Sequence, residues 1–233
     1  LFPDAAIARM DRDAVSGKNA HFMILQRFEN GEIDILIGTQ MIAKGHDFHN
    51  VTLVGVIAAE TGLHLPDFRA GERTFQLLTQ VAGRTGRGDL GGEVIIQTFT
   101  PTHYAILAAQ HHDYLAFYDR EIAFRQQLRY PPFSRMVNIV LQGADEDFTR
   151  ELAAQMAAML NAAPQGPQRV TVLGPSPAPL TKIRSKYRFQ LLLKCDHSAY
   201  MRNFVKTQLE RLREMVAVKD AQILVDVDPV HLL

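Results

Sequence analysis

The chain has 233 residues, enough for one large domain or two ordinary ones, and 47% of them are hydrophobic, which is enough for substantial cores. Lys and Arg together number 25, and so do Asp and Glu, so the overall charge does not argue for a nucleic-acid partner. Any DNA contact must therefore come from local patches. One cysteine excludes an internal disulfide framework and suits a reducing compartment, and no apolar run is long enough to span a membrane.

The first part of the chain alternates short apolar strands with amphipathic helices. Because strands that alternate with helices tend to pair in parallel, this pattern predicts a mainly parallel sheet covered on both faces. The expected strands are residues 5–10, 33–38, 51–58 and 93–98, and the expected helices are residues 19–30, 70–84, 102–111 and 113–129. The last two helices carry the chain away from the sheet.

A glycine turn follows the strand at 33–38, in the run Gly38-Thr39-Gln40-Met41-Ile42-Ala43-Lys44-Gly45-His46-Asp47-Phe48. A strand that ends in Gly-Thr presents a hydroxyl and backbone N–H groups where a phosphate can dock. Lys44 is a candidate phosphate contact, and Asp47 could accept hydrogen bonds from a ribose or orient an arginine. Taken alone, such a turn is common in α/β proteins.

Two arginines three positions apart, Arg84 and Arg87, follow Gln80 and are separated by glycine. Guanidinium groups stabilise the negative charge that develops on a transferring phosphoryl group, and glycines let the backbone approach a ligand closely. The alternative is a solvated basic turn at a helix end, where arginines are favoured. The glutamine, the glycines and the upstream turn together favour the phosphate interpretation.

The pattern changes from Arg135 onward. Pro131-Pro132 cannot continue a helix, so the boundary between the two parts falls near residues 130–134. The expected strands are then 135–142, 169–173, 187–194 and 222–227, and the expected helices are 145–162 and 198–216. The order β-α-β-β-α-β is that of a ferredoxin-like domain.

A basic segment lies between the two middle strands of this second part. After the proline-rich run 174–180 come Lys182, Arg184, Lys186 and Arg188, with Tyr187 among them, on a predicted hairpin or loop. Such a segment can grip phosphates while Tyr187 stacks on a base or packs beneath it. A loop made basic for solubility explains the same residues equally well.

The two glycine-containing stretches, 38–48 and 80–88, resemble motifs V and VI of the superfamily-2 helicases, which lie on the second of two RecA-like lobes. The chain is more closely similar to the primosomal protein N′ (PriA) family of replication-restart helicases. The similarity is carried by residues 37–48, 65–69 (Leu-Pro-Asp-Phe-Arg), 72–84, 130–133, 173–175, 187–194 and 225–229. It spans nearly the whole chain, and Gly71 and Thr85, which stand where alanine is expected, remove no ligand.

This resemblance implies roles for the candidate residues. Arg87 would be the arginine finger, Arg84 a second γ-phosphate contact and Gln80 a sensor of phosphate. Gly45 and Asp47 would line the nucleotide side of the cleft, while Thr39 would bond the backbone of the tracked DNA strand. The C-terminal domain of the family is associated with branched DNA, which favours DNA binding by Lys182, Arg184, Lys186, Tyr187 and Arg188.

The resemblance also implies the organisation of the protein. Residues 1–112 would be a partial RecA-like helicase lobe 2, residues 113–134 a helical connector, and residues 135–233 a ferredoxin-like DNA-binding domain. No Gly-rich loop ending in Gly-Lys-Ser/Thr and no Asp-Glu-x-His box occurs in the sequence. We therefore expect a C-terminal fragment of a 3′-5′ DNA helicase, with ATP and Mg²⁺ held mainly by a missing first lobe. The fragment alone should hydrolyse no ATP.

The zinc-binding insertion of the family is missing too, since Cys195 is the sole cysteine. The implied partners are single-stranded and forked DNA, the single-stranded-DNA-binding protein and helicase-loading proteins of the primosome, in the bacterial cytoplasm near the nucleoid and not at a membrane. Two alternatives stay open. One is another superfamily-2 motor of the fork-reversal or repair type, and the other is a non-enzymatic DNA-binding and partner-docking module.

Overall fold

The computed structural model describes residues 2–11, 20–39, 50–83, 91–215 and 221–232. The chain divides into two compact units. The first contains residues 1–64 and 71–117, and the second contains residues 65–70 and 118–233. Residues 65–70 thus belong to the second unit, although the chain on either side of them belongs to the first.

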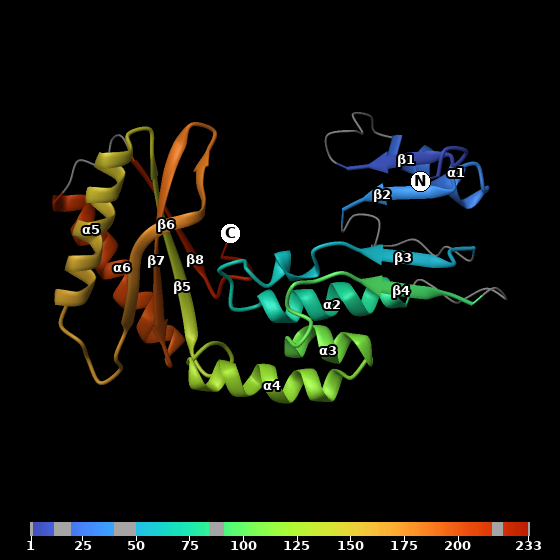
Figure 1. Ribbon diagram of the computed structural model, residues 1–233. Helices are drawn as coiled ribbons and strands as arrows, with labels where there is room; N and C mark the ends of the chain where they lie inside the picture. Colours follow the sequence, from blue (N-terminus) through green and yellow to red (C-terminus); the bar gives the residue numbers. More distant parts are fainter. Residues whose placement is uncertain (1, 12–19, 40–49, 84–90, 216–220, 233) are drawn as a thin grey trace. The chain divides into compact units, whose positions relative to one another are not determined.

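The first unit is built from two parallel strand pairs, each joined through a helix (Figure 1). β1 (Ile7–Met10) pairs with β2 (Ile35–Gly38) around α1 (Ala20–Glu29). β3 (Leu53–Val56) pairs with β4 (Glu93–Ile96) around α2 (Ala70–Ala82). The predicted strands and their parallel pairing are confirmed, and each strand is shorter than its apolar run. The single sheet that was predicted is not seen in the described residues, where the strands form two separate two-stranded sheets.

The connections of the first unit carry one element that the sequence did not predict. A short 3-10 turn, η1 (Ala59–Gly62), precedes α2, and the residue before it, Ala58, has a left-handed backbone with φ 52°. After β4 come α3 (Tyr104–Gln110) and α4 (Tyr114–Gln127), close to the expected ranges. His103 caps α3 by accepting a hydrogen bond from the Ala105 N–H.

The core of the first unit forms around α2 because its apolar residues recur at helical spacing. Phe75 and Leu78 are buried, and the Phe75 ring stacks on Phe117 with centroids 4.4 Å apart. Alanines of α3 and Ile106 complete the cluster. Burying each large apolar side chain contributes about 1.5–3 kcal/mol, so packing on this face fixes the rotation of α2.

The second unit contains a four-stranded antiparallel sheet covered by two helices on one face (Figure 1). Its elements appear in the predicted order, and the strands are arranged β6-β7-β5-β8. They are β5 (Arg135–Gly143), α5 (Glu146–Ala162), β6 (Thr171–Ile183), β7 (Lys186–Cys195), α6 (Ser198–Met215) and β8 (Ala221–Val227). Alternate residues of β5 and β7 face the helices and form a buried apolar cluster with them.

β6 is longer than the sequence predicted. The expected strand ended at residue 173, but β6 continues through the proline-rich run to Ile183, with register shifts between Leu173 and Ser176 and between Pro177 and Lys182. β6 lies at the edge of the sheet. Because a proline has no N–H to donate, it is tolerated on an edge strand, where one side needs no partner. Pro175, Pro177 and Pro179 occupy alternate positions of this edge.

Candidate nucleic-acid interface

Seven of the twelve candidate residues lie where the structure describes the chain. Arg84, Arg87, Lys44, Gly45 and Asp47 fall outside the described residues. Their assigned roles stay predictions. The described candidates are Thr39, Gln80, Lys182, Arg184, Lys186, Tyr187 and Arg188.

Thr39 directly follows the last residue of β2 and is exposed. β2 pairs in parallel with β1, so Thr39 stands at the carboxyl edge of a parallel pair. Ligands of α/β sheets bind beyond this edge, where loop hydroxyls and backbone N–H groups project. The position suits a contact with a phosphate backbone.

Gln80 lies in the last turn of α2 and is exposed. Gln80 lies two positions after Leu78, and at 100° per residue that places it on the opposite side of the helix from the buried face. The Gly83 N–H donates to the Thr79 carbonyl, so helical bonding continues up to the edge of the arginine motif. Packing of Phe75 and Leu78 therefore sets the direction in which Gln80 projects.

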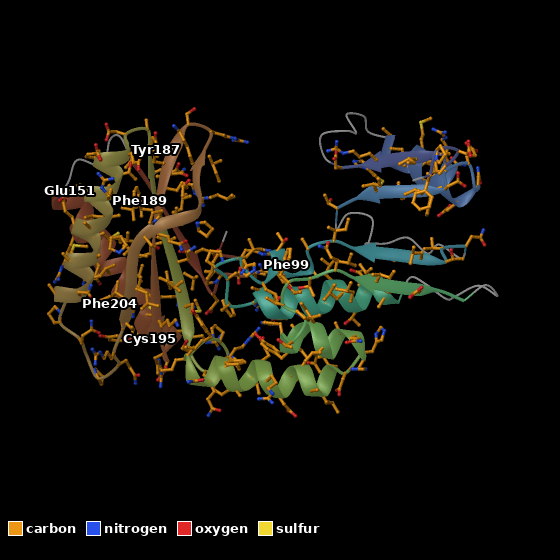
Figure 2. All side chains as sticks on the ribbon, viewed as in Figure 1. Phe99, Glu151, Tyr187, Phe189, Cys195 and Phe204 are labelled. Carbon is orange, nitrogen blue, oxygen red and sulfur yellow. The ribbon has the colours of Figure 1, made fainter. Side chains whose placement is uncertain are left out.

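The basic segment of the second unit forms a β-hairpin between β6 and β7. Lys182, Arg184 and Lys186 are exposed, and Tyr187, which Figure 2 labels, is half-buried. Lys182 lies opposite Tyr187 in the ladder, with its Nζ 4.2 Å from the ring centroid and 3.0 Å from the tyrosine hydroxyl. Lys182 and Tyr187 thus form a contact pair near the end of the hairpin. Both strands of the hairpin carry cationic side chains there.

The tip of the hairpin is a two-residue turn, Arg184-Ser185, with φ of 48° and 61°. Positive φ at both central residues is typical of a type I′ turn, which usually carries Asn-Gly. A non-glycine residue in this region costs about 1–3 kcal/mol, and the ladder pairs Ile183–Lys186 and Lys182–Tyr187 hold the turn in place. The turn projects the Arg184 side chain from the end of the sheet.

Arg188 differs from the other three cations. Its side chain is buried, with 9% of the residue exposed, and its Nη1 donates to the Leu180 carbonyl at 3.1 Å. Arg188 thus joins β7 to β6 next to the second register shift. Its contact with DNA stays a prediction, and holding the hairpin together is the role that its geometry supports.

Three carboxylates that are buried in the described ranges were not singled out from the sequence, and one of them, Glu121, pairs with Arg125 on α4. Glu60 lies in η1, and its pKa is held below the usual range by a hydrogen bond from its own backbone N–H, then by the Thr98 hydroxyl and the Phe99 N–H. Asp67 lies in the segment 65–70, and the Leu-Pro-Asp-Phe-Arg match at 65–69 was its only signal. Neither Glu60 nor Asp67 shows the local periodicity or motif spacing that marks a site.

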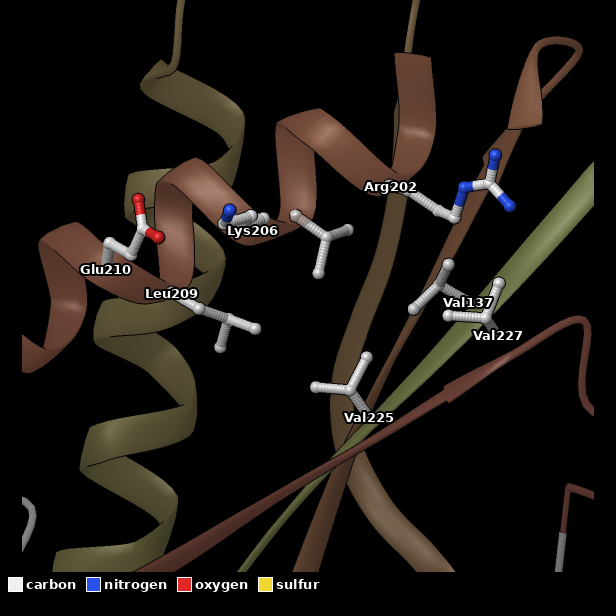
Figure 3. A pocket seen from close by; sticks show the side chains of 8 residues that line it. Val137, Arg202, Lys206, Leu209, Glu210, Val225 and Val227 are labelled. Atoms are coloured by element: carbon white, nitrogen blue, oxygen red, sulfur yellow. The ribbon is translucent and has the colours of Figure 1, made fainter. Parts of the chain in front are cut away.

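A hollow of ≈ 310 Å³ lies between α6 and the sheet of the second unit (Figure 3). Its floor is apolar and its rim carries two cations and a carboxylate. The lining residues are Val137, Arg202, Val205, Lys206, Leu209, Glu210, Val225 and Val227. The helices therefore leave the β8 end of the sheet incompletely covered, since Val225 and Val227 remain partly exposed.

The described residues contain no group of three or more His, Cys, Asp or Glu side chains that could hold a metal ion. Cys195 is buried on β7 (Figure 2). None of the helices in the described ranges combines the length and apolarity that a membrane crossing requires.

Two family models match the chain in succession. The helicase conserved C-terminal domain matches residues 11–89, and the primosomal protein N C-terminal domain matches residues 126–230. A solved amidase of the hydantoinase/carbamoylase family from Burkholderia ambifaria overlaps 40% of this chain and 27% of its own, with 16% identity and a TM-score of 0.29. That likeness carries no argument.

Curated relatives match almost the entire chain. The replication restart protein PriA of Bacillus subtilis is 42% identical over 98% of this chain and 28% of its own length. The PriA proteins of Treponema pallidum and Synechocystis are 41% and 40% identical, over 100% and 99% of this chain and 35% and 27% of theirs. The chain thus spans roughly a third or less of these relatives.

The match to the helicase conserved C-terminal domain, on the unit that precedes the antiparallel sheet, places the chain in a helicase family. Within that class, the matched C-terminal domain and the identity along the chain show that it belongs to the PriA family of replication restart proteins.

Proposed function

We propose that this chain is the C-terminal part of an ATP-dependent 3′-5′ DNA helicase that recognises stalled or branched replication forks and restarts replication by primosome assembly. The observation that carries the proposal is the identity of about 40% along nearly the whole chain with proteins named replication restart protein PriA. These relatives are about three to four times as long, which fits a chain that supplies only part of the complete protein.

The first unit would act as the second RecA-like lobe of the motor. Arg87 would serve as the arginine finger, Arg84 as a second γ-phosphate contact and Gln80 as the sensor, while Gly45 and Asp47 line the cleft. Support comes from Gln80, which is exposed at the end of a helix fixed by its buried face. ATP and Mg²⁺ would be bound mainly by a first lobe outside this chain, so the chain alone would hydrolyse no ATP.

The second unit would be a ferredoxin-like DNA-binding domain. The element order and the strand order β6-β7-β5-β8 support this classification. Lys182, Arg184 and Lys186 would contact phosphates without reading sequence, while Thr39 and Lys44 of the first unit would hold the tracked strand. We extend to this protein the family's partners, namely forked DNA, the single-stranded-DNA-binding protein and primosome loading proteins. Its place would be the bacterial cytoplasm at the nucleoid.

The complete protein, meaning the polypeptide in which this chain is joined to an ATP-binding lobe, provides the test. We expect DNA-stimulated ATP hydrolysis and unwinding of a forked substrate. The Arg87→Ala variant should lower ATP turnover about a thousandfold or more while fork binding stays nearly intact, because the finger stabilises the transition state rather than the DNA complex.

Arg150→Ala is the matched control, since Arg150 is an exposed arginine of α5 that pairs with Asp147. Near-normal turnover of Arg87→Ala would refute the finger assignment. Fork binding by the complete protein without any hydrolysis would instead favour a DNA-binding and partner-docking module.

A further inference from the structure

The six residues 65–70 connect η1 to α2, and they cluster with the second unit. Ala70 is the first residue of α2, the helix that carries Gln80 and leads to Gly83. The start of this helix is therefore fixed by contacts made within the second unit. Two sets of such contacts are present, one centred on Asp67 and the other on Phe68.

Asp67 is buried, with 8% of the residue exposed, and both of its carboxylate oxygens accept backbone hydrogen bonds. Oδ1 accepts the Arg69 N–H at 2.9 Å, and Oδ2 accepts the Leu232 N–H at 3.1 Å. The Asp67 carbonyl accepts the Ala70 N–H at 3.0 Å. One residue thus organises the entry to α2 and binds the chain 165 positions further on.

The segment that reaches Asp67, residues 228–232, is fixed at both of its ends. The Asp228 N–H donates to the Met136 carbonyl of β5 at 2.8 Å. Pro229 and Leu232 are buried, and Asp228 has a φ of 51°, which turns the chain out of β8. The hydrogen bond between Leu232 and Asp67 is therefore made by a segment that is anchored on the sheet and partly buried.

Phe68 is held by one aromatic contact and two cation–π contacts. One face stacks on Tyr130, with centroids 5.5 Å apart and an interplanar angle of 16°. The guanidinium groups of Arg69 and Arg125 each lie 5.4 Å from the Phe68 centroid, in cation–π contact. The Lys194 Nζ of β7 lies 3.6 Å from the Tyr130 centroid and donates to the Leu128 carbonyl. The aromatic pair thus ties the α2 entry to the sheet.

We infer that Asp67 is a positioning residue: its carboxylate, bound by the Leu232 N–H, fixes segment 65–70, at whose end α2 begins. This inference rests on the proposed function for its catalytic consequence. The structural role of the bond between Asp67 and Leu232 can be tested without measuring activity. A carboxylate is required because two N–H donors approach it and an amide offers only one acceptor oxygen. Segment 228–232 thus holds segment 65–70 within the second unit.

The test uses the complete protein and two variants that break the same bond from opposite sides. Asp67→Asn replaces one acceptor by a donor, and Leu232→Pro removes the N–H donor. Leu232→Met is the matched control, since it keeps the N–H and nearly the same volume. We expect kcat for DNA-stimulated ATP hydrolysis to fall roughly ten- to a hundredfold in both variants, because small misplacements cost rate steeply. The KM for ATP and the Kd for forked DNA should change less than about threefold, and Leu232→Met should match the wild type.

Hydrogen exchange supplies the readout that is independent of activity. In both variants the amides of residues 69–73 should exchange faster than in the wild type, while those of β5 stay unchanged. The double variant should lose no more kcat than either single variant, because both remove one interaction. Unchanged exchange at residues 69–73 would overturn the inference, and so would lost kcat with unchanged exchange. If the wild-type protein hydrolyses no ATP, the proposed function fails. The exchange result still shows whether the bond between Asp67 and Leu232 fixes residues 69–73.

Discussion

Gly62 in η1 approaches Thr74 in α2 so closely that a β-carbon at position 62 would lie 2.7 Å from the Thr74 Oγ1. Thr74 is buried, and its Oγ1 has no hydrogen-bond partner among the described residues. The contact explains how η1 can pack against α2 without a gap. It also means that each of the two residues limits the size of the other.

The Gly62→Ala substitution should therefore destabilise the protein by about 1–3 kcal/mol, since an extra methyl group in a packed site forces its neighbours apart. Thr74→Ala removes the opposing hydroxyl and should restore most of the loss when it is combined with Gly62→Ala. Urea unfolding of the two single variants and the double variant measures the coupling. Additive effects would show that the two positions do not press on each other.

The basic hairpin provides the second prediction. Changing Lys182, Arg184 and Lys186 together to glutamate should weaken the binding of forked DNA strongly and reduce its dependence on salt, because each cation that contacts a phosphate releases counterions. If all three contact phosphates, the log–log dependence of affinity on salt should flatten by about 2–3 in slope. Binding titrations across a salt series provide the measurement.

A control with the same change in net charge separates the hairpin from a general electrostatic effect. Arg120, Arg150 and Arg211 are exposed arginines on three different helices, α4, α5 and α6. Glutamate at these three positions should leave most of the fork affinity and its salt slope in place. Equal losses from the two triple variants would remove the special role of the hairpin.

The turn at the hairpin tip leads to a stability prediction of the opposite sign. Ser185 has a φ of 61°, so Ser185→Gly should stabilise the protein by about 0.5–1 kcal/mol, because glycine adopts this conformation without strain. Ser176→Gly, on the extended strand β6, is the matched control and should destabilise by a similar amount. Thermal unfolding of the two variants compares them directly. A loss of stability in Ser185→Gly would mean that the serine side chain outweighs the strain.

Glu60 should make the first unit sensitive to acid. Its folded-state pKa lies below the ordinary 4.5, so its contribution to stability is fully present above that pH and is lost as the pH falls through the lower folded-state pKa. Glu60→Gln should be less stable than the wild type near neutral pH and should lose less stability on further acidification. Melting temperatures from pH 6 to pH 3 measure the difference, with Glu151→Gln on the exposed face of α5 as control. Parallel curves for wild type and Glu60→Gln would contradict the assignment.

Local patterns in the sequence predicted most elements of both units but not all of their limits. The alternation around residues 7–10, 35–38, 53–56 and 93–96 was enough to predict parallel pairs, since periodicity and spacing are local properties. β6 was cut short at residue 173 because proline ordinarily ends a strand, and the sequence does not say which strand lies at an edge.

The sequence likewise predicted some features of the candidate site and not others. A run of cations can be read directly from residues 182–188, but the burial of Arg188 depends on where β6 folds back over β7. The bond between Asp67 and Leu232 joins residues 165 positions apart and has no signature in either neighbourhood. Such long-range contacts follow from tertiary packing, which single-sequence patterns do not encode.

Pro175, Pro177 and Pro179 leave the outer margin of β6 poor in donors for a further strand. Backbone pairing with a second copy of the chain, the first step in cross-β polymerisation, is therefore disfavoured along this part of β6. β8, the opposite margin, contains no proline between residues 221 and 227. Any intermolecular strand exchange or aggregation that begins from the intact sheet would thus start at β8, and a lysine or proline introduced there should make the protein more resistant to fibril formation at high concentration.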